Sequence, residues 1–345
     1  MKVNTREVVL LTSELECSNI FTNMNIAIIG AGLIGRKRAM SLPKGVHLTI
    51  VCDTDKERAK KFADEFNCKI ETDWKKVVND PSIRALIIST PNKYLSIVAK
   101  SAIKAGKHVL IEKPGARNSK EMDEIIKAHQ KNKVVVMFGF NHRYHPAILQ
   151  AKKIVDSKKY GEVLFIRAKY GHGGRLGYEK EWRFDKDIAG GGELLDQGSH
   201  LIDLVNLFTG ELKYHSSFVG TLFWKTKLED TSFLLLKNKN VVANLSVSCV
   251  EWKNLFCYEI TLRSAKIQID GLGRSYGAEK LTLYKMKKEM GPPVIEEFTF
   301  PEEDLSWERE TGVFFERIKK NDVSNKSLKE AKYVLEIIRQ SYKKS

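Results

Sequence analysis

Lys113, Asp196 and His200 have side chains that transfer protons or stabilise negative charge, and their surroundings in the sequence favour such roles. Lys113 follows an apolar run and precedes Pro114, so it would stand at the end of a strand and could donate to a substrate oxygen. Asp196 and His200 have the spacing i,i+4 and would share one helix face, where the carboxylate orients the imidazole and supports its charged form. A surface lysine and a helix-face salt bridge are the alternatives for isolated motifs. The glycines at 190–192 favour the catalytic interpretation, because they let backbone and ligand come close.

A glycine-rich turn, Gly30-Ala31-Gly32-Leu33-Ile34-Gly35, lies between an apolar run and an amphipathic stretch. In a strand–turn–helix of this kind the glycines allow a tight turn and bring a pyrophosphate close to the helix N-terminus. Asp53 ends the next apolar run, where its carboxylate would bond ribose hydroxyls and repel a 2′-phosphate. The pattern predicts a dinucleotide site that favours NAD(H). Arg36-Lys37-Arg38 keeps NADP(H) open, although the simpler interpretation is that these residues cover the first helix.

The elements that must position these residues follow from an alternation of short apolar runs and amphipathic stretches. We predict strands at 26–29, 47–52, 85–89, 108–111 and 134–138, and helices from about 33 and at 55–66, 95–105 and 119–131. Continuous apolar strands separated by helices predict a doubly wound α/β domain, whose parallel sheet is covered on both faces. Ligands of such sheets bind at the carboxyl ends of the strands, where Lys113 would lie.

The pattern changes after residue 146. A helix at 147–157 and a strand at 163–170 lead into a glycine-rich loop, and further strands are predicted at 217–224, 231–236, 241–249, 258–262 and 266–270. Because no helix-length segment separates the later strands, they predict an open antiparallel sheet in an α+β domain, closed by helices near 305–319 and 328–342. We therefore divide the chain into an extension at 1–23 that need not be ordered, a Rossmann domain at 24–145, and a substrate and oligomerisation domain at 146–345.

Composition excludes several classes of protein. A hydrophobic content of 42% excludes a disordered chain, and the apolar runs are far shorter than a membrane span of about 20 residues. The net charge is +15, but the lysines are scattered among acidic residues, so no nucleic-acid partner is expected. Five cysteines without a CxxC pair, and no signal peptide, predict a cytoplasmic protein. His142 and His145 flank a cationic Arg143 and have no third ligand nearby, so no metal site is expected.

The sequence resembles the Gfo/Idh/MocA family of oxidoreductases in an ordered set of motifs. These are the glycine turn at 30–35, Thr90-Pro91-Asn92, Glu112-Lys113-Pro114, Phe140-Asn141-His142-Arg143, the stretch at 190–200, and the closing Ser327-Leu328-Lys329-Glu330-Ala331. The resemblance covers about residues 24–343. It implies a Rossmann domain followed by an open antiparallel-sheet domain, in agreement with the pattern of elements.

The resemblance also implies a role for each matching residue. Lys113 would contact the substrate hydroxyl beside the nicotinamide, His200 would transfer the proton, and Asp196 would assist it. The implied cofactor site is Gly30, Gly32, Leu33, Ile34, Gly35, Asp53, Thr90, Asn92, Glu112 and Lys113. The implied substrate residues are Arg143, Trp182 and Arg183, while His172 and Arg175 could bind a sugar hydroxyl or phosphate or belong to a flexible turn. Leu95 stands where many members have a histidine, which leaves the chemistry intact but weakens the transfer of substrate identity.

The expected function is NAD(P)-dependent hydride transfer between nicotinamide and a secondary alcohol or ketone of a sugar, cyclitol or nucleotide-linked sugar. The positive charge, with Arg175 and Arg183, favours an anionic substrate, and a homodimer or homotetramer is expected. One alternative is an elimination or glycosidase-type reaction in which NAD is recycled within the site. The other is a redox-silent dinucleotide-binding regulator, which would be expected to have lost Lys113 or His200.

Overall fold

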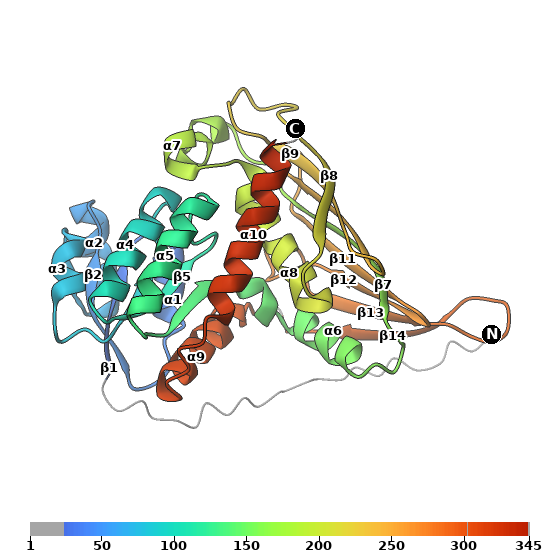
Figure 1. Ribbon diagram of the computed structural model, residues 1–345, viewed down its shortest axis with the longest axis horizontal. Coiled ribbons are helices and arrows are strands. Elements are labelled where there is room, and N and C mark those ends of the chain that lie inside the picture. Colours follow the sequence, from blue (N-terminus) through green and yellow to red (C-terminus); the bar gives the residue numbers. More distant parts are fainter. Residues whose placement is uncertain (1–23, 302, 344–345) are drawn as a thin grey trace.

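The computed structural model describes residues 24–301 and 303–343, so the predicted extension at 1–23 lies outside the described residues. The first sheet has six parallel strands in the order β3-β2-β1-β4-β5-β6 (Figure 1). They are β1 Met24–Ile29, β2 Val46–Cys52, β3 Lys69–Glu71, β4 Ala85–Ile88, β5 His108–Glu112 and β6 Val136–Gly139. The strand order reverses between β1 and β4, and ligands of open α/β sheets bind at such a point. The predicted doubly wound domain is confirmed.

Helices cover both faces of this sheet and explain why its central strands are apolar throughout. They are α1 Leu33–Met40, α2 Lys56–Phe66, α3 Trp74–Asn79, α4 Asn92–Lys104 and α5 Ser119–Lys131. Asp55 and Asn118 begin α2 and α5 by accepting the backbone N–H groups of Arg58 and Glu121. The sequence patterns missed β3 and α3, because elements of three and six residues are too short to show a period.

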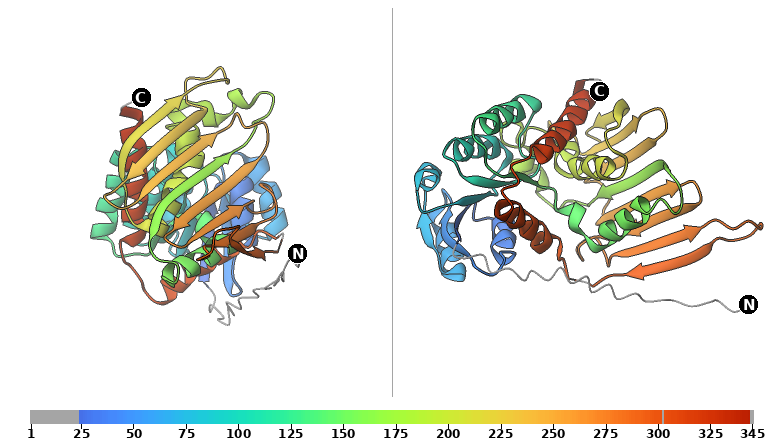
Figure 2. Two further views of the ribbon diagram at one scale, coloured as in Figure 1. Left: turned by 90° about the vertical axis from the view of Figure 1, so that its right-hand side faces the viewer. Right: turned by 60° about the horizontal axis from the view of Figure 1, so that its bottom comes forward.

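The second sheet has eight strands in the order β14-β13-β12-β11-β7-β10-β9-β8. They are β7 Val163–Gly171, β8 Lys213–Gly220, β9 Thr231–Lys237, β10 Val242–Ser248, β11 Leu255–Leu262, β12 Ala265–Asp270, β13 Lys280–Lys285 and β14 Val294–Thr299. All pairs are antiparallel except β7 with β10, so the predicted antiparallel sheet is a mixed one. Among the described residues, no helix covers one face of this sheet (Figure 2, left).

Two helices, η1 Asn141–Tyr144 and α6 Pro146–Asp156, connect the first sheet to the second. The helical segments between β7 and β8 carry several of the predicted site residues: η2 Tyr178–Lys180, η3 Trp182–Phe184, α7 Lys186–Ala189, the π-helical turn η4 Leu194–Gly198, and α8 Ser199–Thr209. Burial alternates residue by residue along β11, as expected for a strand with one face on helices and one face uncovered. The inner face of the second sheet therefore packs on α6 and α8.

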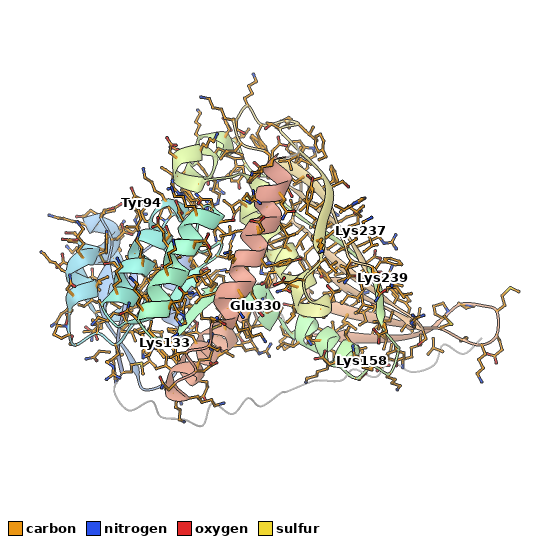
Figure 3. The ribbon with its side chains drawn as sticks, viewed as in Figure 1. Tyr94, Lys133, Lys158, Lys237, Lys239 and Glu330 are labelled. Carbon is orange, nitrogen blue, oxygen red and sulfur yellow. The ribbon has the colours of Figure 1, made fainter. Side chains whose placement is uncertain are left out.

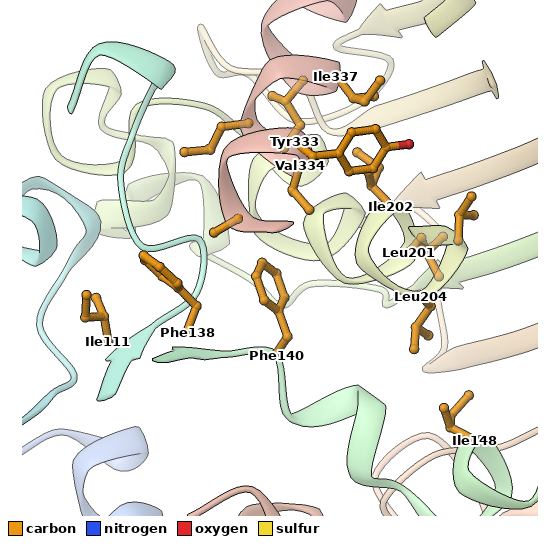
Figure 4. Close-up of a cluster of buried hydrophobic side chains, with 14 of the residues drawn as sticks. Ile111, Phe138, Phe140, Ile148, Leu201, Ile202, Leu204, Tyr333, Val334 and Ile337 are labelled. Atoms are coloured by element: carbon orange, nitrogen blue, oxygen red, sulfur yellow. The ribbon is translucent and has the colours of Figure 1, made fainter. Parts of the chain in front are cut away.

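The last two helices, α9 Ser306–Lys319 and α10 Lys326–Lys343, return to the first domain. Phe314 and Phe315 of α9 are fully buried in one cluster with Ile26 and Ile28 of β1. Helix α10 lies between the two sheets (Figures 1 and 2). A cluster of buried side chains from β5, β6, the residue after β6, α8 and α10 joins the domains (Figure 4): Ile111, Phe138, Phe140, Leu201, Ile202, Val334 and Ile337. The domain limits at 145 and 146 stay a prediction. Helix α9 follows them in the sequence but packs on the first domain.

Within residues 24–301 and 303–343, no helix combines the length and the apolar character needed to cross a membrane.

Candidate active site

Only glycine fits at the first and third glycine positions of the turn. Gly30 has a φ of +107°, and a Cβ there would lie 2.5 Å from the Ser89 carbonyl oxygen. A Cβ at Gly35 would lie 2.0 Å from the carbonyl oxygen of Gly30, so α1 packs directly on the turn. Gly35 therefore supports the turn without lining the cleft, as the sequence pattern predicts for its third glycine.

Asp53 stands at the carboxyl end of β2 and faces this turn. Its carboxylate accepts the backbone N–H of Ala31 at 2.8 Å and that of Asp55 at 3.0 Å. The guanidinium of Arg58 lies 3.7 Å away. Asp53 thus holds the turn through its hydrogen bonds and also lines the cleft.

One cleft, of about 990 Å³, runs from the glycine turn to the second sheet. On the first sheet it is lined by Gly30, Gly32, Leu33, Ile34, Asp53, Thr90, Asn92, Glu112 and Lys113, and at the second sheet by His172, Arg175, Trp182, Arg183, Asp196 and His200. The hydroxyl oxygen of Thr90 is buried without a hydrogen-bond partner among the described residues. This orphaned oxygen and the glycine cradle fit a dinucleotide. The predicted residues, apart from Gly35 and Arg143, are therefore brought together along one cleft.

Lys113 and Asp196 form the centre of the cleft. The Lys113 ammonium donates to the backbone carbonyl of Asp196 at 2.9 Å and forms an ion pair with its carboxylate. Arg183 lies 3.3 Å from the second carboxylate oxygen. Burial by itself would raise the pKa of Asp196, but Lys113 and Arg183 outweigh burial and hold the pKa below its usual range. Asp196 is therefore a carboxylate that balances two cations. The Lys113–Pro114 peptide bond is cis.

His200 differs from the expectation drawn from its spacing to Asp196. The turn that carries Asp196 is π-helical, and its carboxylate is directed to Lys113 and Arg183. His200 Nδ1 is buried and has no hydrogen-bond partner among the described residues, so a carboxylate does not orient this ring. Burial, followed by the positive charge of Lys113, lowers the pKa of His200 well below its ordinary value. The ring is neutral at physiological pH and can accept a proton.

Arg143 does not line the cleft, so its role as a substrate residue stays a prediction that its position does not support. Its guanidinium is bound to Asp203 of α8 at 2.5 Å and to Glu330 of α10 at 2.8 Å (Glu330 is labelled in Figure 3). The pair with Asp203 is buried, and burial of an unpaired charge is costly, so Arg143 is held where it is. Its sequence motif carried no information on which residues of distant helices it would meet.

Glu112 and Asn92 reach the cleft, but their polar groups are already bound to protein. The Glu112 carboxylate accepts the guanidinium of Arg38 at 2.5 Å, and the Asn92 amide donates to the backbone carbonyl of Ala189 at 2.9 Å. Arg38 is fully buried and also binds Glu310 at 2.6 Å. Of the three basic residues after the turn, Lys37 lines the cleft and Arg36 pairs with Glu65. Arg38 therefore neither covers the surface of α1 nor binds a phosphate.

The sequence patterns missed several aromatic residues at the substrate end of the cleft. Tyr170, Tyr178 and Tyr276 line it, and Tyr178 makes an edge contact with His172 at 5.3 Å between ring centres. Tyr170 ends the predicted strand 163–170, so its position at the cleft could have been inferred from the strand end alone. Among the described residues, no group of three His, Cys, Asp or Glu side chains could hold a metal ion.

Comparison with known proteins identifies the family. Residues 24–140 match the family described as "Oxidoreductase family, NAD-binding Rossmann fold", and residues 148–268 match the "GFO/IDH/MocA C-terminal domain". The chain belongs to the Gfo/Idh/MocA oxidoreductase family. Its first domain is thus an NAD-binding Rossmann domain.

Two curated Gfo/Idh/MocA relatives act on cyclic polyols according to their names. Levoglucosan dehydrogenase of Pseudarthrobacter phenanthrenivorans is 30% identical over 212 residues, which are 58% of this chain and 54% of that protein. Inositol 2-dehydrogenase of Salmonella typhimurium is 32% identical over 153 residues, which are 43% of this chain and 46% of that protein. The chain thus spans about half the length of the curated relatives it matches.

A solved structure, levoglucosan dehydrogenase in complex with NADH, has the same fold throughout. Its TM-score with this chain is 0.85 at 22% sequence identity, and the match covers 94% of this chain and 98% of that one. At this identity the likeness bears on the fold, including the eight-stranded sheet of the second domain.

Proposed function

We propose that this protein is an NAD-dependent dehydrogenase that interconverts a secondary alcohol and a ketone on a cyclic sugar or cyclitol. The observation that carries the proposal is the meeting of Lys113 and His200 in the cleft that begins at the glycine turn. NAD(H), when bound, supplies the hydride acceptor or donor. The names of the levoglucosan and inositol dehydrogenases support the class of substrate.

Lys113 is suited to bind the reacting oxygen. An ammonium has three N–H donors, and two of them are directed to the carbonyl and the carboxylate of Asp196. The third donor is available to a substrate hydroxyl or to the alkoxide that develops from it. A fixed positive charge in a site closed to water stabilises such an alkoxide strongly.

His200 is suited to accept the hydroxyl proton during oxidation and to return it during reduction. Its low pKa keeps the ring neutral, with a lone pair available at physiological pH. Asp196 supports both groups through its charge, since it binds Lys113 and raises the proton affinity of His200 that burial lowers.

The charges at the substrate end favour an uncharged substrate over the anionic one that the sequence suggested. Arg183 lies between Asp196 and Glu181, and Arg175 forms an ion pair with Glu181. A substrate anion would have to displace these carboxylates. Hydroxyl groups of a neutral polyol can instead share the existing donors and acceptors, and Tyr178 and Trp182 line the same end of the cleft.

Asp53 favours NAD(H), because its carboxylate would repel a 2′-phosphate. Arg58, the nearest cation, pairs with both Asp53 and Asp55. Lys37 is the remaining basic side chain of the cleft that could favour NADP(H). We therefore propose NAD(H) as the cofactor.

We also propose a cytoplasmic location, no nucleic-acid partner and a homo-oligomeric state. Cys52, Cys68, Cys249 and Cys257 are free thiols, which supports a cytoplasmic location. The exposed lysines Lys133, Lys158, Lys237 and Lys239 are spread over both domains (Figure 3), which argues against a nucleic-acid surface. The uncovered face of the second sheet carries Phe218 and Phe233, each about half exposed, and supports a homo-oligomer.

Two variants test the catalytic assignment. Lys113→Ala and His200→Ala should each lower turnover by about 100-fold or more, as expected for loss of electrostatic or acid–base catalysis. Both should bind NADH nearly as tightly as the wild type in a fluorescence titration. Wild-type turnover in either variant would contradict the assignment.

A further inference from the structure

The ring of His200 is held without the hydrogen bond that usually orients a catalytic imidazole. In most such sites the second ring nitrogen donates to a carboxylate or a backbone carbonyl, which fixes the tautomer and the ring plane. Here Nδ1 is buried and has no partner among the described residues, and Asp196 is bound to Lys113 and Arg183. Some other contact must hold the ring plane.

That contact is an aromatic stack. The imidazole of His142 lies face to face with that of His200, with 3.7 Å between ring centres and 14° between ring planes. Phe140 and Tyr170 meet the His200 ring at their edges, at 6.1 and 6.2 Å. A ring enclosed in this way cannot turn about its χ2 angle without displacing the ring stacked on it.

Hydrogen bonds hold His142 in place, so its ring can restrain the ring stacked on it. Its Nδ1 lies 3.2 Å from the Asn141 side-chain oxygen, and the Asn141 amide donates to the Ser306 hydroxyl at 3.0 Å. This chain of bonds assigns the proton of His142 to Nδ1. His145 closes its edge at 5.5 Å and is bound to Glu279 at 2.5 Å. The anchoring bonds reach α9 and the second sheet.

We propose that His142 is a positioning residue, which by stacking on His200 holds that ring with Nε2 directed into the cleft. The inference rests on the proposed function, in which His200 transfers the proton. Proton transfer requires the ring nitrogen within hydrogen-bond reach of the substrate oxygen. Rotation of the ring would present a carbon instead, and turnover would fall while the cofactor site stayed as it is.

The charged and titratable groups around the stack are consistent with two neutral rings. Lys113, Asp196 and His145 act on His200, and His145, Lys113 and Lys37 act on His142. Glu279 and Asp304 pair with His145. Burial, followed by the neighbouring His200, lowers the pKa of His142 well below its ordinary value. The stack therefore has no like-charge repulsion at physiological pH.

The test compares a flat with a non-flat replacement of His142. In the NADH-bound protein, imidazole NMR signals of His200, assigned by their loss in His200→Ala, should stay one sharp set in His142→Phe and broaden or double in His142→Leu. With levoglucosan and inositol as substrates, kcat of His142→Leu should fall about tenfold or more, since general acid–base catalysis contributes at least that much. The Phe variant should stay within about threefold of the wild type, and the solvent deuterium isotope effect on kcat should rise in the Leu variant alone.

Phe256→Leu is the matched control, because Phe256 makes an edge contact with His142 at 6.1 Å and has its remaining ring contacts with tyrosines. Phe256→Leu should change neither the His200 NMR signals nor kcat. NADH affinity and Tm verify folding, and His142→Gln replaces the Leu variant if that one does not fold. Equal His200 signals in the Leu or Gln and Phe variants would overturn the proposal. If His200→Ala keeps wild-type turnover, that result contradicts the proposed function, independently of the NMR comparison of the His142 variants.

Discussion

Lys113, Asp196 and Arg183 share one ion-pair network at the centre of the cleft, and His200 lies within its field. The network gives the two candidate catalytic groups opposite tasks. In the proposed reaction Lys113 lies beside the reacting oxygen, and its positive charge lowers the pKa of His200. An ammonium beside a neutral imidazole suits the oxidation of an alcohol.

The low pKa of His200 predicts the pH dependence of alcohol oxidation. The neutral ring is the active form, and both burial and Lys113 lower its pKa below the ordinary value of 6.5. As pH falls, kcat/KM for oxidation should therefore stay high through 6.5 and reach half its maximum at a more acidic pH. A pH profile of initial rates measures this. A half-maximum at or above 6.5 would contradict the role or the environment assigned to His200.

The two tasks of Asp53 predict different effects of two substitutions. Asp53→Asn keeps an oxygen for the Ala31 N–H and removes the charge, so it should lower the preference for NADH over NADPH about tenfold, as expected for loss of one charged contact. Asp53→Ala should in addition weaken the binding of both cofactors, because the turn loses its support. Fluorescence titrations with both cofactors measure this, and an unchanged preference in Asp53→Asn would show that the carboxylate does not select the cofactor.

Three elements far apart in the sequence meet at Arg38. This residue of α1 binds Glu112 at the end of β5, directly before Lys113, and Glu310 of α9. Trp307 of α9 covers its guanidinium at 4.6 Å. Burial raises the pKa of Glu310 to about 7, against the lowering effect of Arg38. The cofactor helix, the strand that carries Lys113 and the C-terminal helix are thus joined by one buried network.

Loss of the guanidinium should therefore destabilise the fold. Arg38→Met leaves two buried carboxylates facing each other without a cation, and breaking a buried ion pair in this way costs about 3–5 kcal/mol. Arg36→Met removes an exposed pair on the same helix and is the matched control, expected to leave stability nearly unchanged. Urea unfolding of both variants measures the difference. Equal stability of the two would mean that the network adds nothing to the fold.

The same network illustrates which features of the site could be predicted from the sequence. The glycine turn, Asp53 and Lys113 were predictable because each depends on a local pattern at the end of a strand. Arg38 meets Glu310 across 272 positions of the chain, and Arg143 meets Glu330 across 187. No period or motif encodes such pairs. The predicted contact between Asp196 and His200 does not form for a local reason, because the turn at 194–198 is π-helical and not α-helical.

At the scale of the whole molecule, the fold class and most elements followed from periodicity. The parallel pairing of β7 with β10 did not, because adjacent predicted strands without helices between them favour antiparallel pairing. Strand β13 and the edge strand β14 were missed, since lysines bound the short apolar alternation of β13 and two glutamates interrupt that of β14. The amphipathic pattern of α9 indicates that one face of the helix is buried, but it does not indicate that this face packs on the first sheet.

The arrangement of the whole molecule explains how one cleft can hold both reactants. The first sheet supplies the cofactor cradle, the second domain supplies the η3, η4 and α8 segments with Arg183, Asp196 and His200, and α10 packs between them (Figure 1). The buried cluster of Figure 4 lies beside this junction and fixes the two parts relative to each other. Hydride transfer needs such fixed placement, because the reacting atoms must come within about 3–3.5 Å.

The most direct test of the account is NADH formation, followed by its ultraviolet absorbance, with levoglucosan, inositol and related cyclic polyols as substrates. The account predicts that the reduced cofactor accumulates with an uncharged cyclic polyol, and that NADH forms faster from NAD than NADPH forms from NADP. His200→Ala should lose this activity while retaining NADH binding. Turnover without net NADH would instead favour an elimination with recycled NAD. No turnover of any secondary alcohol by protein that binds NADH would contradict the proposed dehydrogenase.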